Sequence, residues 1–138
     1  MLAFAALQAA VYKALMGAPG LTAIVGTRIY DDTPHEAEAT STAFPRVSIG
    51  EQSGEFEGTS DSDLFGVEIV VHAWSRAPGR KECLEIVGQI YAALHRQSLP
   101  ATAGYIVNME YAAHDTAKEA DGETYHATVR FTGLLQTS

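Results

Sequence analysis

Hydrophobic and polar residues alternate with a period of two along residues 64–74, which predicts a β-strand. One side of this strand carries only apolar side chains, those of Val67, Ile69, Val71 and Ala73. The other side is mixed and carries Glu68, Val70, His72 and Trp74. A mixed side of this kind is too polar for a closed core and too apolar for simple solvation. We therefore interpret it as a candidate interface with another subunit or loop.

The period changes to 3.6 residues after Pro78-Gly79, which predicts an amphipathic helix beginning at Arg80. Its apolar stripe consists of Cys83, Val87, Ile90, Tyr91 and Leu94. Its opposite face consists of Glu82, Glu85, Gln89 and Arg96. Strand and helix together contain most of the expected core, so the helix is expected to lie on the sheet to which the strand belongs.

The rest of the pattern predicts two further helices and four further strands. Helices are expected at residues 2–16 and 19–25, the second beginning at Pro19 and capped by Gly26. Strands are expected at residues 28–30, 44–50, 105–114 and 124–134, the last two joined by a turn at Asp121-Gly122. We predict one α+β domain over residues 1–138, an antiparallel or mixed β-sheet of about four to five strands with helices packed on one face.

Acidic residues concentrate in residues 31–43 and 51–63, two segments without an apolar period that we expect to be loops. Nine of the seventeen acidic residues lie between Asp31 and Asp63, where Arg46 is the only basic residue. Solvated loop surface is the simplest interpretation of each one. A sharper hypothesis is that the loops repel DNA phosphates or contact a basic partner. The partner-facing candidates are then Glu51, Glu55, Glu57, Asp61 and Asp63.

The charge balance disfavours a protein that binds nucleic acid by neutralising phosphates. The net charge is −8, the pI is near 4.9, and the nine Lys and Arg residues are scattered. No apolar run approaches the roughly 20 residues that span a bilayer, and the N-terminus does not resemble a secretory signal. We expect a soluble protein made in the cytoplasm, with a core that needs no disulfide.

Motifs for nucleophilic, nucleotide and zinc chemistry are absent from the sequence. The single cysteine, Cys83, falls on the apolar stripe of the helix, which favours a buried thiol over a nucleophile. Glu68 and His72 are about 13 Å apart along one strand at roughly 3.3 Å per residue, too far for acid–base coupling. We assign no catalytic residue and no cofactor.

His114, Asp115 and His126 form the best remaining candidate for a metal site. A hairpin centred on Ala120 would make the two histidines cross-strand partners, whereas a two-residue loop at Asp121-Gly122 would pair His114 with Val129. The sequence leaves both registers open. Because surface histidines are the more common case, we assign no metal site.

Several segments in order resemble one family, the small tail-completion or tail-terminator proteins of long-tailed phages and gene transfer agents. The matching runs are ALQAAVY at 6–12, LTAIVGTRIYD at 21–31, AFPRV at 43–47, HAWSR at 72–76 followed by GRKE at 79–82, and DGETYH at 121–126. The runs span most of the chain. The two acidic segments match no pattern of the family.

The resemblance implies a structural role without catalysis, and the family offers no catalytic residues. Such proteins form a ring, usually of six subunits, that caps the finished tail tube and joins the head connector, while DNA passes through the bore. The implied partners are further copies of the chain, the tail tube protein and the head-side connector or stopper protein. Neither specific DNA binding nor membrane contact is implied. The implied location is the neck region of a virion or gene-transfer-agent particle, assembled in the host cytoplasm.

Pattern and resemblance together suggest how the surface is used. The subunit-interface candidates are Val70, His72, Trp74 and Arg76. The acidic segments would project toward the bore or toward neighbouring rings, and an acidic bore lets DNA slide because it lacks the cations that retain phosphate. Two rivals remain: a head–tail adaptor or neck protein on the head side of the joint, and a small metal-dependent enzyme using His114 and His126.

Overall fold

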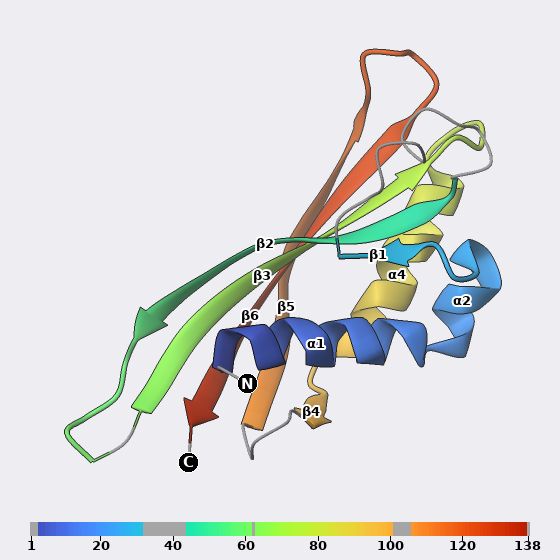
Figure 1. Cartoon of the computed structure of the whole chain (residues 1–138). Helices are drawn as coiled ribbons and strands as arrows, with labels where there is room; N and C mark the ends of the chain where they lie inside the picture. Colours follow the sequence, from blue (N-terminus) through green and yellow to red (C-terminus); the bar gives the residue numbers. More distant parts are fainter. Residues whose placement is uncertain (1–2, 32–43, 62, 101–105, 138) are drawn as a thin grey trace.

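The computed structural model describes residues 3–31, 44–61, 63–100 and 106–137, which contain three helices and six strands (Figure 1). The helices are α1 (Ala3–Met16), α2 (Pro19–Val25) and α4 (Lys81–Leu94). The strands are β1 (Ile29–Tyr30), β2 (Arg46–Phe56), β3 (Asp63–Ser75), β4 (Ser98–Pro100), β5 (Ile106–Lys118) and β6 (Tyr125–Thr137). No helix in these ranges is long and apolar enough to cross a membrane.

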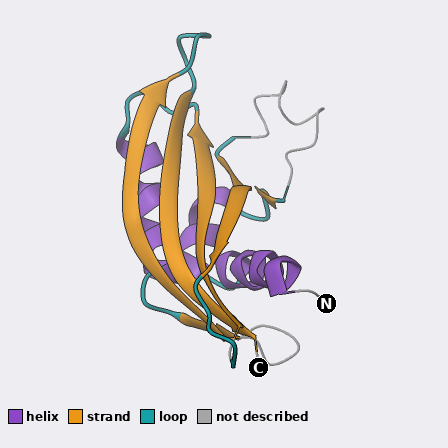
Figure 2. Ribbon diagram, turned by 90° about the vertical axis from the view of Figure 1, so that its left-hand side faces the viewer, coloured by secondary structure: helices purple, strands orange, loops and turns teal. Residues whose placement is uncertain are grey.

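The strands form one mixed sheet in the order β1-β2-β3-β6-β5-β4. Only β1 and β2 run parallel, and every other neighbouring pair is antiparallel. The helices lie together on one side of the curved sheet (Figure 2). The predicted α+β class and mixed sheet are confirmed, but the sheet has six strands. The unpredicted strand is β4, whose three residues show no alternation and become a strand by pairing with residues 106–108 of β5.

The core lies between the helices and the central strands. Val67, Ile69, Val71 and Ala73 are buried, as predicted for the apolar side of β3. The α4 stripe differs at two positions. Tyr91 is 42% exposed and stacks on the ring of His95, whereas Ile86 is fully buried. Tyr91 lies at the edge of the stripe, where a large ring with a polar tip reaches the surface.

The segment 51–63 is only partly a loop: residues 51–56 and Asp63 are strand, and residues 57–61 belong to the connection, so the predicted extent of the loop is wrong. Strand β2 continues through Phe56 and forms with β3 a long hairpin that extends past the helices (Figure 1). A register shift between Ile49 and Gln52 interrupts the alternation there. Beyond it, pairing with β3 satisfies the backbone of a polar strand. The first acidic segment falls outside the described residues except Asp31, which accepts a 2.7 Å hydrogen bond from Gln8.

The β5–β6 hairpin is longer than predicted and ends in the turn at Asp121-Gly122. Gly122 has a φ of 76°, a conformation that glycine adopts without steric cost. The register pairs His114 with Val129 and His126 with Ala117. Of the two registers left open by the sequence, the structure therefore has the one in which the histidines are not partners.

Candidate interaction surface

The described helices cover one face of the sheet, so the opposite face carries the polar half of every central strand. Along β3 this open face holds Glu68, Val70, His72 and Trp74, the mixed side predicted from the sequence. The antiparallel register adds residues from both neighbouring strands. Trp74 is flanked by Arg46 of β2 and His126 of β6. Side chains distant in the sequence thus form one continuous surface.

Four of these residues, Arg46, His72, Trp74 and His126, form what we call the aromatic–histidine cluster. The Trp74 ring stacks on His126 with centroids 4.7 Å apart and planes inclined by 14°. On Trp74, the Arg46 guanidinium carbon lies 4.7 Å from the ring centroid, within the range of cation–π attraction. His72 completes the group, with its ring centroid 5.6 Å from that of Trp74. In this cluster His72, Trp74 and His126 are half-buried, and Arg46 is buried.

A row of polar contacts crosses the same cluster. His72 Nδ1 lies 2.8 Å from His126 Nε2. The outer nitrogens of the two rings face carboxylates, with His72 Nε2 3.4 Å from Glu51 and His126 Nδ1 2.9 Å from Glu119. Burial lowers the pKa of His126, an effect reinforced by His72 and opposed by Glu119. The pKa of Glu51 is also lowered, first by a backbone hydrogen bond and then by His72.

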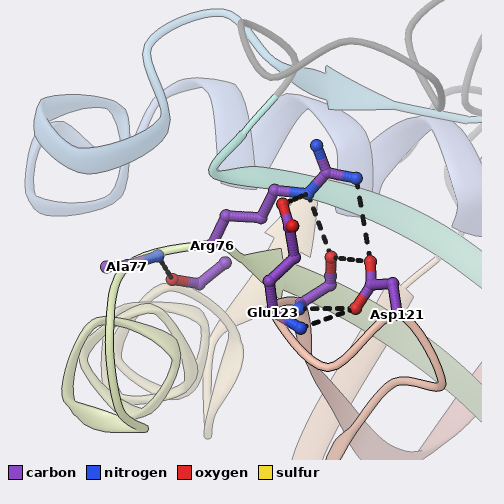
Figure 3. A network of polar contacts seen from close by, with 6 residues as sticks. Arg76, Ala77, Asp121 and Glu123 are labelled. Carbon is purple, nitrogen blue, oxygen red and sulfur yellow. Dashed lines mark hydrogen bonds and ion pairs between the residues drawn. The ribbon is translucent and has the colours of Figure 1, made fainter.

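Arg76 follows β3 and joins it to the β5–β6 turn (Figure 3). Its Nε donates to Thr124 Oγ1 at 3.0 Å and lies 3.4 Å from Glu123, and its terminal nitrogen lies 3.8 Å from Asp121. Asp121 in turn accepts hydrogen bonds from the Thr124 hydroxyl and from the backbone N–H groups of residues 123 and 124. These bonds lower the pKa of Asp121 to about 2. Arg76 and the hydrogen bonds of Asp121 therefore both hold the turn that follows Glu119, the residue that contacts His126.

The acidic candidates do not form one group. Glu51 belongs to the histidine row, whereas Asp61 and Asp63 lie in and after the β2–β3 turn. Glu55 and Glu57 line a groove of about 770 Å³ on the open face, together with Glu68 and Glu110. Glu57 reaches over Gly66, where an added Cβ would lie 2.6 Å from its carboxylate oxygen. Four carboxylates therefore line this groove.

The structure gives no support to chemistry at the remaining candidates. His114 hydrogen-bonds the Tyr111 hydroxyl at 2.6 Å and faces away from His126, because the two residues lie on opposite faces of the hairpin. Among the described residues no group of three or more metal-ligating side chains is arranged to hold a metal. Cys83 is buried, and burial raises the pKa of its thiol to about 11, so it stays protonated at neutral pH.

Sequence reasoning missed the contributions of Arg46, Glu119 and His126 to this surface. The turn at Asp121-Gly122 sets only the β5–β6 register, which pairs His126 with Ala117, whereas the place of His126 beside Trp74 comes from the β3–β6 register. The other two positions depend on the β2–β3 register and on a turn conformation, which the sequence does not determine.

The described part of the chain is a small α+β domain with a buried core and a polar, aromatic surface on the open face of its sheet. The family model of the tail completion protein gp17 matches residues 9–136. The chain therefore belongs to this family and is a structural, tail-associated virion protein. The resemblance noted in the sequence is confirmed.

The fold is shared with a protein in the solved structure "Virion of native gene transfer agent (GTA) particle". The two chains superpose with a TM-score of 0.86 at 20% identity, and the match covers 97% of each. At this identity the likeness establishes the fold. No curated protein sequence matches the chain.

Proposed function

We propose that this chain is the tail terminator, which caps the finished tail tube as a homo-hexameric ring and joins it to the head-side connector. The observation that carries the proposal is the open sheet face. It gathers stacked aromatic and charged groups from three strands on a chain of the tail completion family. A surface with an aromatic centre and a polar rim is typical of a protein–protein contact.

In this proposal Val70, His72, Trp74 and Arg76 belong to the contact between neighbouring subunits. Trp74 is its anchor, because large rigid rings dominate binding energy in the centre of interfaces. Arg76 holds the β5–β6 turn beside that anchor and so fixes the shape of the contact. A ring requires two different patches on each subunit, since a head-to-tail contact closes only by rotation. The partner patch then lies elsewhere on the next copy.

The acidic groove has a separate role in the proposal. Glu55, Glu57 and Glu68 make no ion pair with any described residue, so their charges remain available to the surroundings. Facing the bore or a neighbouring ring, they would repel DNA phosphates and let DNA pass without being retained. In this proposal the whole chain has a structural function and no catalytic one.

The charge reversal Glu55→Lys/Glu57→Lys tests the groove. We expect tails of normal length but reduced DNA delivery, measured as transfer of a marker gene per particle. The matched control is Glu85→Lys, compared with the single variant Glu55→Lys, because it reverses one exposed charge on α4 outside the groove and outside the ion pairs of the described residues. Delivery equal to that of the control would contradict the role of the groove.

Deletion of the gene tests the terminator role itself, with particles examined by negative-stain electron microscopy. We expect overlong tails that are separated from filled heads, because tube growth is not stopped and the joint is not completed. Tails of normal length with leaking heads would instead place the protein on the head side of the neck. Fully normal particles would contradict the structural role.

A further inference from the structure

Four side chains from four segments form a row across the open face. Glu51 lies on β2, His72 on β3, His126 on β6, and Glu119 follows the end of β5. The contacts along the row measure 3.4, 2.8 and 2.9 Å. Gly50 leaves the space that the first ring occupies, because an added Cβ there would lie 2.6 Å from His72 Cδ2 and Nε2.

The number of protons in this row follows from its geometry. Ionised carboxylates accept hydrogen bonds but do not donate them, so His72 Nε2 and His126 Nδ1 must each carry a proton to bond with Glu51 and Glu119. Between the rings one nitrogen must donate and the other accept, which requires one more proton. The row therefore uses three N–H protons. Two neutral imidazoles have only two, so the pair carries one additional proton and one positive charge.

We infer that His72 and His126 share a single additional proton, and that taking up a second proton breaks the link between them. With two protons added, His72 Nδ1 and His126 Nε2 would both carry hydrogen and face each other without an acceptor. The β2–β3 hairpin would then lose the histidine contact to the end of the β5–β6 hairpin, while the contacts of Arg76 with the turn remain. The histidine row is thus an acid-sensitive hydrogen-bonded contact between strands β3 and β6 on the open face.

The charged groups around the row favour one added charge and oppose a second. Glu51 of β2 and Glu119 of the turn contact the rings directly, and Asp115 of β5 adds a more distant negative charge that favours protonation of His126. Opposing them are Arg46 of β2, stacked on Trp74, and Arg130 of β6, which lies 3.6 Å from Asp115. Lys118 lies over the ring of Tyr125, on the covered side of the sheet. The carboxylates thus balance one imidazolium but are partly offset by the arginines.

The direction of the pH effect follows from His126. Burial and the neighbouring His72 lower its pKa below the usual value of 6.5. The unfolded chain therefore binds the second proton more readily than the folded pair, and folding stability decreases as the pH falls below about 6.5. Because His72 and Trp74 also belong to the proposed subunit contact, acidification should weaken ring assembly. Only this last step rests on the proposed function.

The direct test is imidazole ¹⁵N NMR of the full chain labelled at histidine, with the five histidines assigned from single variants. At neutral pH we expect His72 and His126 together to show three protonated nitrogens, with a scalar coupling across the hydrogen bond between them. Two neutral rings at that pH, or rings that titrate independently, would overturn the inference. A stoichiometric transition metal retained on the pair would also overturn it, because the metal would replace the shared proton.

A second test measures how the stability of single variants against urea depends on pH. We expect His126→Gln to remove most of the decrease in the urea midpoint between pH 6.5 and 5.0, and Gly50→Ala to have the same effect by displacing the His72 ring. His114→Gln, which changes a histidine outside the row, should retain the wild-type dependence. An unchanged pH dependence in both row variants would contradict the inferred acid-sensitive contact between His72 and His126. Loss of the pH effect on the monomer without one on ring assembly would contradict only the proposed subunit contact.

Discussion

The two faces of strand β3 differ although their residues alternate along one short segment. On the covered face Ile69 and Val71 are fully buried against helices of the same chain. On the open face His72 and Trp74 remain partly exposed and contact charged groups from both neighbouring strands. The apolar side chains of the covered face are buried within the chain, whereas His72 and Trp74 of the open face remain available to a partner.

From this difference we expect the covered face to determine folding stability and the open face to determine assembly. Removal of apolar volume from the covered face leaves a cavity in the core and lowers the free energy of unfolding. Removal of a side chain from the open face changes what the chain can bind, with a smaller effect on its own stability. The comparison holds if stability and assembly respond to substitutions on different faces.

The largest expected effect is on the covered face. Ile69→Ala should lower the free energy of unfolding by about 2–5 kcal/mol, because it creates a cavity below α4. Glu68→Ala, the adjacent residue on the open face, should change it by no more than about 0.5 kcal/mol. Urea denaturation of both variants measures the contrast. Equal losses would show that the two faces do not differ in this way.

An intermediate effect is expected where β5 and β6 approach closely. An added Cβ at Gly133 would lie 2.3 Å from the backbone oxygen of Asn108, so Gly133→Ala should cost about 1–3 kcal/mol. The control is Gly88→Ala in α4, where the added Cβ meets nothing within 4 Å. This control should stabilise the protein by about 0.5–1 kcal/mol. Thermal unfolding of the two variants should therefore shift in opposite directions.

A smaller effect concerns the turn at the end of the open face. The lowered pKa of Asp121, about 2, is held first by the Thr124 hydroxyl and then by backbone N–H groups. Its contribution to stability is therefore present above its ordinary pKa of about 3.9 and is lost as the pH falls toward 2. Carboxyl NMR titration should show Thr124→Ala moving the pKa of Asp121 upward. An unchanged value would contradict the role of the hydroxyl.

The covered half of the fold could be predicted from the sequence because each part of it follows from a local period. The apolar side of β3 and most of the α4 stripe required only the positions of residues such as Ile69 and Ile90. Even there, Tyr91 was placed in the core by its apolar ring, although its hydroxyl and its place at the stripe edge bring it to the surface.

The open half depends on contacts between distant segments, which a local pattern does not contain. Glu55 looked like a loop residue because strand β2 is polar beyond its bulge, and only pairing with β3 makes that segment a strand. His126 was recognised as a surface residue, but its contacts with His72 and Trp74 require the β3–β6 register. The identity of the mixed face was therefore predictable, while its geometry was not.

The most direct test of the open face as a ring contact uses a strain lacking the gene, complemented with Trp74→Ala. A thermal unfolding curve of the purified variant first verifies that it is folded, and Leu84→Ala, at an exposed position on α4, is the matched control. Tail lengths are then measured by negative-stain electron microscopy. The account predicts overlong tails detached from heads for Trp74→Ala and normal particles for Leu84→Ala. Tails of normal length joined to filled heads in the folded Trp74→Ala variant would contradict it.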